Sequence, residues 1–282
     1  NDSVDGTDKE PLYGSLYLPR KFKICVTIPE DNSMDMLTHD LGLLQIWEGE
    51  ELKGYNILIG GGMGMNHNQP KTYPRLATPI GFVQPQDMLK AVEAVVKMQR
   101  DWGDRGNRKH ARLKYLVEEK GIEWSIASFK QYFKNAGGGE VKTAIDGIKY
   151  EIPDYMGWHK QQAEDGEHHG QYFLGIPIPS GRILNSDASD IVLYPYQQAP
   201  HTERHAIPNI RAALKELATK YGKDMVITAD QNIIIADIEE AERADFESIL
   251  RSHNVKLRED ISNIDRYMMA CVALPTCGKA LA

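Results

Sequence analysis

The apolar positions of the first sixty residues follow the spacing of β-strands. Residues 22–28 alternate between apolar and polar side chains and stop at Pro29, which predicts a strand. Two further apolar runs, 41–47 and 55–59, are separated by the polar, glycine-containing stretch 48–54. Because a short polar connection between two apolar runs is typical of a hairpin, we expect these runs to pair with each other.

The pattern changes to helical spacing at Asp87. Pro85 marks the start, and apolar residues then recur on one helical face until about 102–103. A second helix is expected over about 110–132, with a break at Gly121. Three consecutive glycines at 137–139 interrupt the periodicity and indicate a surface connection.

The second half of the chain has a different order of elements. Residues 172–178 have strand character, and a helix is expected from Pro208 to Tyr221, with Gly222 at the position after its last turn. Two apolar runs, 225–228 and 233–236, flank a polar turn and predict a hairpin. Asp237 is a candidate cap for a further helix that carries Phe246, and 255–257 is expected to form a last edge strand.

This order, β-α-β-β-α-β, is that of the ferredoxin-like split βαβ unit. We therefore expect the α+β fold class. The polar stretch 187–206, between the first strand and the first helix of the unit, is expected to be a loop.

Composition excludes several classes of protein. The 282 residues carry a formal net charge of -7, which argues against a nucleic-acid-coating surface. No apolar run approaches the length of a membrane span, and the polar, acidic first residues resemble neither a secretory signal nor a transit peptide. Three cysteines are too few for a disulfide framework, so we expect reduced thiols in a cytoplasm-like compartment.

Positive charge is concentrated between Lys97 and Tyr115. This stretch carries seven lysines and arginines against two aspartates, a local charge of +5 that favours anion binding. A solvated helix end, where cations are favoured by the helix dipole, explains the same pattern. Arg112 and Lys114 would point about 200° apart on a regular helix, so their joint action on one anion requires a bend or a helix start between them.

Two other stretches are candidates for ligand binding. Gly60, Gly61 and Gly62 directly follow a predicted strand, where backbone amides can approach an anion, but a tight turn without a ligand explains them equally well.

Cys271 and Cys277 are too far apart in sequence for the usual redox or zinc pair. Iron–sulfur ligation normally needs four sulfurs, and Cys25, in a predicted core strand, is expected to be a buried apolar residue. The histidine pairs 168/169 and 201/205 lie in polar loops without converging carboxylates and predict no metal site.

Several stretches, taken together, resemble the sirohaem-dependent sulfite and nitrite reductases. They occur in the order found in that family: 17–23 (YLPRKFK), 60–62 (GGG), 99–103 (QRDWG), 108–115 (RKHARLKY), 229–232 (ADQN) and 269–277 (MACVALPTC). The chain is similar to the middle and later part of an assimilatory sulfite reductase haemoprotein, from about Pro11 to the last residue.

The resemblance implies a division of the chain into four parts. After a flexible lead-in at 1–10, a first sirohaem-binding α/β module is expected at 11–165 and a ferredoxin-like module at 166–258. Residues 259–282 would open a second module that binds sirohaem and the iron–sulfur cluster. The N-terminal module of the family and its second cysteine pair are missing, so the resemblance implies a fragment that is inactive alone.

The resemblance also implies site residues and cofactors. Arg112 and Lys114 would bind sulfite over sirohaem and assist protonation during six-electron reduction to sulfide. Cys271 and Cys277 would be the first two ligands of a four-iron four-sulfur cluster. The haem periphery would be held by Gly60, Gly61, Gly62, Arg100, Arg108, Lys160, Gln231 and Asn232.

The pattern Arg112-x-Lys114-Tyr115 looks more like sulfite than nitrite reductases, although a sirohaem nitrite reductase and a non-catalytic anion-binding module remain alternatives. The implied partners are sulfite, a ferredoxin or flavoprotein electron donor, and the remaining parts of the same reductase, with no nucleic acid or membrane. The expected location is the cytoplasm, or the plastid stroma in a photosynthetic eukaryote. The loop 187–206 looks longer than the family's usual connection and would be a tolerated surface insertion.

Overall fold

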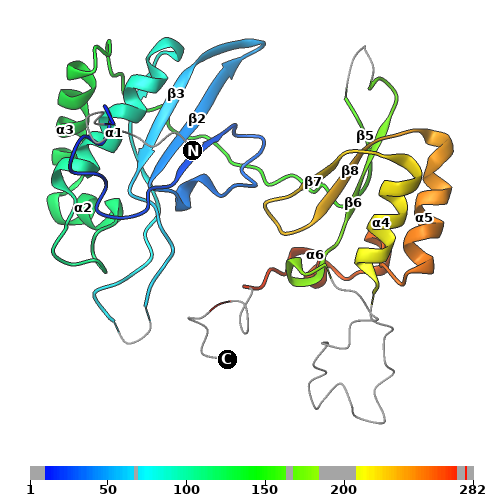
Figure 1. The fold of residues 1–282 in the computed structure, drawn as a ribbon. Coiled ribbons are helices and arrows are strands. Elements are labelled where there is room, and N and C mark those ends of the chain that lie inside the picture. The colour runs from blue at the N-terminus through cyan, green and yellow to red at the C-terminus, as the bar shows by residue number, and fades with distance from the viewer. Residues whose placement is uncertain (1–9, 67–68, 163–167, 184–207, 272–276, 278–282) are drawn as a thin grey trace. The chain divides into compact units, whose positions relative to one another are not determined.

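The computed structural model divides the chain into two compact units, residues 1–153 and 154–282 (Figure 1). The structure describes residues 10–66, 69–162, 168–183, 208–271 and 277. The expected loop at 187–206 and residues 1–9 of the expected lead-in at 1–10 therefore lie outside the described residues. Within them, no helix has the length and apolar character required to cross a bilayer.

The first unit is a four-stranded sheet packed against helices. The sheet order is β1-β2-β3-β4, with β1 parallel to β2 and the other neighbours antiparallel. The predicted strand and hairpin are confirmed as β1, β2 and β3. The strands are β1 (Ile24–Thr27), β2 (Leu41–Glu48), β3 (Glu51–Ile59) and β4 (Thr78–Val83).

Three helices cover this sheet with the apolar faces that their sequences predict. Helix α1 (Met88–Trp102) begins after Pro85, as expected. The second predicted helix is divided at Gly121 into α2 (Leu113–Lys120) and α3 (Ile122–Asn135), because Gly121 has a φ of 82° that a continuing helix does not allow. The helices bury residues such as Val95, Leu113 and Phe129 against β3 in one core.

The second unit is a four-stranded sheet with two helices packed on it. The sheet order is β5-β6-β8-β7, and all neighbours are antiparallel. Its elements are β5 (Gly157–Lys160), β6 (Tyr172–Ile176), α4 (Ile210–Tyr221), β7 (Met225–Ile227), β8 (Ile233–Ile238), α5 (Arg243–Ser252) and the short α6 (Asn263–Tyr267). The predicted hairpin is confirmed, as is the helix end at Gly222, whose φ is 62°.

The structure of this unit differs from three expectations: its first residue, the strand at 255–257 and the cap of α5. The unit starts at residue 154 rather than 166, because β5 pairs with β6. The expected strand at 255–257 does not form, since β5 already occupies the free edge of β6; Val255 and Leu257 are instead buried in the core. Asp237 does not cap α5; Glu239 and Glu242 form the capping box that begins this helical segment. The α+β fold class, with its ferredoxin-like unit, is confirmed.

Candidate anion site at the glycine turn

Five predicted site residues of the first unit, Gly60, Gly61, Gly62, Arg112 and Lys114, meet at residues 60–64, which we call the glycine turn. This turn leaves the end of β3, and Arg112 and Lys114 reach it from the start of α2. Arg112 is extended (φ −81°, ψ 154°) and precedes the first helical residue, Leu113. The helix start required for joint action of Arg112 and Lys114 is therefore present.

Lys114 is completely buried, and its ammonium is held by carbonyl oxygens of the protein. Nζ donates to the carbonyls of Gly62 at 3.1 Å and Gly64 at 2.8 Å, and also to that of Tyr73. The ammonium lies 5.9 Å from the ring centre of Tyr73 and 4.9 Å from that of Tyr115. We call these three carbonyls and two rings the lysine cage.

The electrostatics of the cage leave Lys114 without a full counter-charge. Burial lowers the pKa of the Lys114 ammonium, the nearby Arg112 guanidinium lowers it further, and Asp40 acts in the opposite direction. Among the described residues, no carboxylate lies within ion-pair distance of Nζ. A buried cation that is solvated by neutral carbonyls is a place where an anion gains stability.

Arg112 forms a bidentate ion pair with Asp40. Nε lies 3.2 Å from Oδ1 and Nη2 2.8 Å from Oδ2, and Nη2 also donates to the carbonyl of Gly61 at 3.2 Å. The guanidinium packs so closely on Gly62 that a Cβ there would lie 2.7 Å from Nη1. Position 62 therefore accommodates Arg112 because it is glycine.

The three consecutive glycines of the turn do not offer their amides to a ligand. The N–H groups of Gly60, Gly61 and Gly62 donate to the carbonyls of Asp40, His39 and Arg75, respectively, at 2.8–2.9 Å. Of the two explanations for these glycines, the structure favours the tight turn, because their three N–H groups already have carbonyl partners. The turn presents carbonyl oxygens to cations, and close packing explains the glycines at 60, 61 and 62.

Arg75 is a third cation on the same turn. Its Nη1 donates to the carbonyl of Gly60 at 3.0 Å, and its Nε lies 3.2 Å from the half-exposed carboxylate of Glu118. Three cations therefore surround the turn, whereas Asp40 is the buried acid among them.

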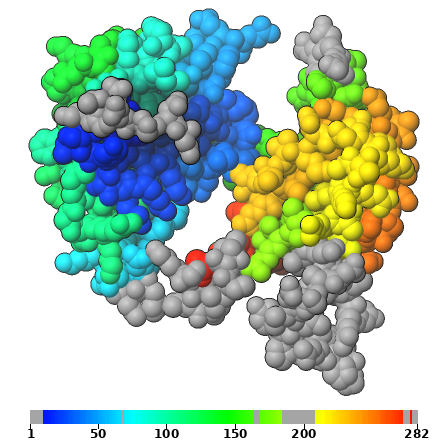
Figure 2. Space-filling view, in the orientation of Figure 1, coloured from blue at the N-terminus to red at the C-terminus, as the bar shows by residue number. Residues whose placement is uncertain are grey.

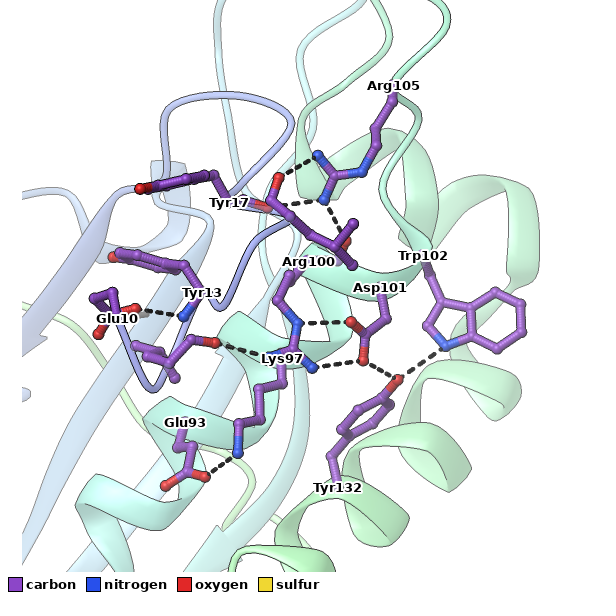
Figure 3. Close-up of polar contacts among 12 residues, drawn as sticks. Glu10, Tyr13, Tyr17, Glu93, Lys97, Arg100, Asp101, Trp102, Arg105 and Tyr132 are labelled. Atoms are coloured by element: carbon purple, nitrogen blue, oxygen red, sulfur yellow. Dashed lines mark hydrogen bonds and ion pairs between the residues drawn. The ribbon is translucent and has the colours of Figure 1, made fainter. Parts of the chain in front are cut away.

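Arg100 and Arg105 lie elsewhere in the first unit (Figure 3). Arg100 pairs with Asp101 and donates to the carbonyl of Leu12 at 2.8 Å, whereas Arg105 donates to the carbonyls of Leu16 and Tyr17 at 3.1 and 2.8 Å. The segment that begins at Glu10 lies directly against this part of the chain in the space-filling view (Figure 2). In the structure these two arginines bind the N-terminal segment rather than the glycine turn. Arg108 is exposed.

The other predicted residues belong to the second unit. Lys160 is exposed at the end of β5. Asn232 accepts the backbone N–H of Ile178 at 2.9 Å, and Gln231 Nε2 donates to the carbonyl of Ala270 at 3.1 Å. The β7–β8 turn thus contacts the residue that precedes Cys271. Gln231 Oε1 is buried and has no partner among the described residues, which leaves an acceptor for a further donor.

The two cysteines supply only part of a cluster site. Cys271 is exposed and Cys277 half-buried, and both are free thiols. Among the described residues, no three histidine, cysteine, aspartate or glutamate side chains gather as a metal site. Because an iron–sulfur cluster needs four ligands, these residues do not complete one.

Sequence reasoning missed three contributors to the glycine turn. Asp40 had a usable signal, since an acidic residue directly before an apolar run lies at the beginning of a buried strand. Arg75 and Tyr73 had none, because a turn of the chain brings them to the site. Lys21 is a further nearby cation: Lys23, the largest cause, burial and Arg112 all lower the pKa of its ammonium.

The fold and this site define an α+β protein with a cluster of cations at a glycine turn, and comparison with known proteins gives the family. Residues 6–136 match the nitrite and sulphite reductase 4Fe-4S domain, and residues 208–253 match the nitrite/sulfite reductase ferredoxin-like half domain. The chain belongs to the nitrite and sulfite reductase family.

Curated relatives agree with this assignment. The chain is 41% identical to a sulfite reductase [ferredoxin] of Synechococcus elongatus over 96% of its own length and 39% of the relative's. It is 39% identical to a sulfite reductase [NADPH] hemoprotein beta-component of Methylorubrum extorquens over 99% of its length and 41% of the relative's. The chain thus spans about two fifths of these relatives.

A solved structure shares the fold. The NirA protein of Mycobacterium tuberculosis superposes with a TM-score of 0.62 at 23% identity, over 91% of this chain and 40% of that one. This likeness supports the architecture described above.

Proposed function

We propose that the chain is part of a sulfite reductase haemoprotein and contributes the cations that bind sulfite and the carboxylates of sirohaem. The observation that carries the proposal is the charge imbalance at the glycine turn: Arg75 pairs with Glu118 and Arg112 with Asp40, whereas the buried Lys114 has only carbonyl partners among the described residues. A polyanionic tetrapyrrole and a small oxyanion both supply the missing negative charge. The names of the relatives, sulfite reductase in each case, support sulfite as the substrate.

The contacts of Lys114 allow an exchange of partners on binding. Its acceptors are neutral carbonyls, and a bond to an oxyanion is charge-assisted and about twice as strong as a neutral one. Of the three acceptors, Gly64 lies in exposed chain, and a Cβ at this position would have open space around it. The Gly64 carbonyl is therefore the partner that an incoming oxyanion would replace.

The side chains then have distinct roles. Lys114 holds a proton at Nζ for an oxide that develops as an S–O bond breaks, and its buried surroundings exclude water. Arg112 binds a second oxygen with Nη1, the nitrogen that takes no part in the pair with Asp40. When bound, sirohaem and the iron–sulfur cluster would supply the electrons.

The haem periphery and the cluster involve the remaining predicted residues. Gly60, Gly61 and Gly62 would contribute by orienting Arg75, Arg112 and Lys114, and the exposed Arg108 and Lys160 are free to reach carboxylates. Gln231, with its unpartnered Oε1, and Asn232 would act in the second unit. Arg100 is proposed for the same role, which requires it to exchange the carbonyl of Leu12 for a haem carboxylate.

Cys271 and Cys277 would supply two cluster ligands, and the rest of the reductase would supply the others. The electron donor would be a ferredoxin or a flavoprotein; one relative is named sulfite reductase [ferredoxin] and another sulfite reductase [NADPH] hemoprotein beta-component. A reducing, cytoplasm-like compartment is supported by three cysteines that are all free.

Substitutions in the complete reductase that contains this chain test the proposal. Lys114→Met and Arg112→Met should each lower sulfite reduction about 100-fold while sirohaem content, measured by its absorption band, is retained. Lys109→Met is the matched control, because Lys109 is an exposed cation of the same stretch. Wild-type activity in both site variants, or a complete reductase that binds no tetrapyrrole when sirohaem is supplied, would refute the proposal.

A non-catalytic anion-binding module is favoured by the same cations and predicts a different result. Sulfate would then bind saturably to the haem-free chain, and binding would persist in a Cys271→Ser, Cys277→Ser variant. In that case the complete protein would show no sulfite reduction.

A further inference from the structure

His110 contacts the lysine cage on the side formed by Tyr73 and Tyr115. Its Nε2 lies 2.6 Å from the carbonyl oxygen of Lys71, so this nitrogen carries a proton and donates it. The imidazole also stacks on the ring of Tyr115, with ring centres 4.2 Å apart and an angle of 8° between the planes. One side chain therefore contacts two of the three chain segments that form the cage, the one that carries Tyr73 and the one that carries Tyr115.

Both contacts lead to the ammonium of Lys114. The ring of Tyr115 lies 4.9 Å from Nζ and packs edge-on against Tyr73 at 5.4 Å. Lys71, the residue held by His110, lies two positions before Tyr73, whose carbonyl accepts a hydrogen bond from Lys114. His110 thus fixes the aromatic side of the cage through Tyr115 and the carbonyl side through Lys71.

Within the described residues, the opposite side of the cage has no comparable side-chain contact. Gly64 is exposed, and its neighbours Met63 and Met65 expose 52% and 63% of their surface. His110 therefore packs against one side of the cage, and the other side faces solvent. A lysine held in this way can change partners on the solvent side while its ammonium stays in place.

We propose that His110 is a positioning residue that holds Lys114 through Tyr115 and the Lys71 carbonyl. This inference rests on the proposed function for its importance in catalysis, but not for its geometry. It predicts that loss of the His110 contacts exposes the ammonium of Lys114 but not the other lysines. It also predicts that a side chain with only the stacking ring, or only the hydrogen-bond donor, protects Lys114 less well than histidine does.

Acetylation kinetics of the 282-residue chain test this inference. Each lysine is followed by mass spectrometry after reaction with acetic anhydride, and the rate at Lys114 is divided by that at the exposed Lys109. His110→Ala should raise this ratio about tenfold, the factor that corresponds to about 1.4 kcal/mol. His110→Phe, which keeps the stacking, and His110→Gln, which keeps a donor, should each raise it less.

His39 provides the control for His110. His39→Gln changes another histidine of the same unit that contacts a backbone carbonyl, that of Asp35, and should leave the ratio unchanged. If His110→Ala unfolds the unit, the ratio also rises at Lys97, and the Phe and Gln variants then decide. An unchanged Lys114 ratio in these variants would overturn the inference.

Failure of the inference can be distinguished from failure of the proposed function. If Lys114→Met leaves sulfite reduction unchanged in the complete reductase, the proposed function fails, whatever the acetylation rates. If acetylation of Lys114 does not respond to His110 while Lys114→Met abolishes activity, only the role of His110 is wrong.

Discussion

Arg112 and Asp40 form a two-point ion pair in which the carboxylate is fully buried and the guanidinium almost so, with 13% of its side chain exposed. The second carboxylate oxygen also accepts the backbone N–H of Lys23 at 2.9 Å. Asp40 thus connects the start of β2 to the start of α2 and determines where Arg112 lies. It also neutralises one of the three cations at the glycine turn, so it competes with any anion that binds there.

Removal of the Asp40 charge should therefore have opposite effects on stability and on anion affinity. Asp40→Asn leaves Arg112 buried without its partner and should lower the free energy of unfolding of the first unit by about 3 kcal/mol. The same change frees Arg112 and should tighten sulfate binding. Urea denaturation followed by tryptophan fluorescence measures the first effect, and calorimetric titration with sulfate measures the second.

Glu51→Gln is the control for Asp40→Asn, because Glu51 forms an exposed pair with Lys53 in the same sheet. It should leave the denaturation midpoint and the sulfate affinity unchanged. Weaker sulfate binding by Asp40→Asn would show that Asp40 orders the site rather than competing with the anion.

The pKa of Lys114 predicts a pH dependence of stability. Because burial, the larger cause, and Arg112 lower this pKa in the folded chain, the unfolded chain binds more protons between the lowered value and the ordinary lysine value. The free energy of unfolding contributed by Lys114 should therefore rise with pH through this alkaline window. Lys114→Met should remove that rise.

The measurement for Lys114 is the difference in unfolding free energy between wild type and Lys114→Met from pH 7.5 to 9.5. Tyr73 and Tyr115 contribute the opposite slope at higher pH, since burial raises the pKa of both phenols, but they are present in both proteins. Lys109→Met should keep the wild-type pH profile. A pH-independent difference would mean that Lys114 is not destabilised as a cation.

Local sequence patterns predicted most helices and strands correctly. The elements that were predicted wrongly depend on contacts between segments far apart in the sequence. The hairpin of β2 and β3 and the helix end at Gly222 depend on neighbouring residues and were predicted correctly. The strand expected at 255–257 was wrong, because the choice of partner for β6 depends on β5, almost a hundred residues earlier. An apolar segment can be buried without joining a sheet.

In the candidate site, too, the local geometry could be predicted from the sequence, whereas the contacts with distant segments could not. The need for a bend or a helix start between Arg112 and Lys114 followed from helix geometry alone, and the structure has a helix start there. The charge of the 97–114 stretch did not reveal that Arg100 and Arg105 bind carbonyls of the N-terminal segment, whereas Arg112 and Lys114 bind the glycine turn. Identical charges acquire different roles because the chain brings different acceptors to them.

The three glycines of the turn should differ in their tolerance of alanine. A Cβ at Gly61 would lie 2.3 Å from the carbonyl oxygen of Leu37 and 2.5 Å from that of His39, and backbone cannot move aside easily. A Cβ at Gly62 would meet the guanidinium of Arg112, which can rotate away. We expect Gly62→Ala to cost about 1–3 kcal/mol of unfolding free energy and Gly61→Ala to cost more.

Gly64→Ala is the matched control for this series, since no heavy atom lies within 4 Å of its Cβ position. It should unfold like the wild type. Combination of Gly62→Ala with Arg112→Ala should show coupling in a double-mutant cycle, because the second change removes the clash. Additive losses would contradict the close packing of Arg112 on Gly62.

Arg105 should control the order of the N-terminal segment. Its guanidinium donates to the carbonyls of Leu16 and Tyr17 and to that of Arg100 (Figure 3), and Tyr17 has a φ of 54°, which an unrestrained tyrosine seldom adopts. Arg105→Ala removes these bonds and should release residues 10–20. Cleavage at exposed Leu16 and Tyr17 by chymotrypsin should become several-fold faster, as followed by mass spectrometry.

The matched control for Arg105 is Lys109→Ala, which removes an exposed cation of the same loop. It should leave the cleavage rate unchanged, which separates loss of the carbonyl bonds from loss of charge. Arg105→Lys should give an intermediate rate, because an ammonium keeps the charge but cannot bridge several carbonyls with a rigid fork. If Arg105→Ala is cleaved no faster than wild type, the packing of residues 10–20 on α1, and not Arg105, holds this segment in place.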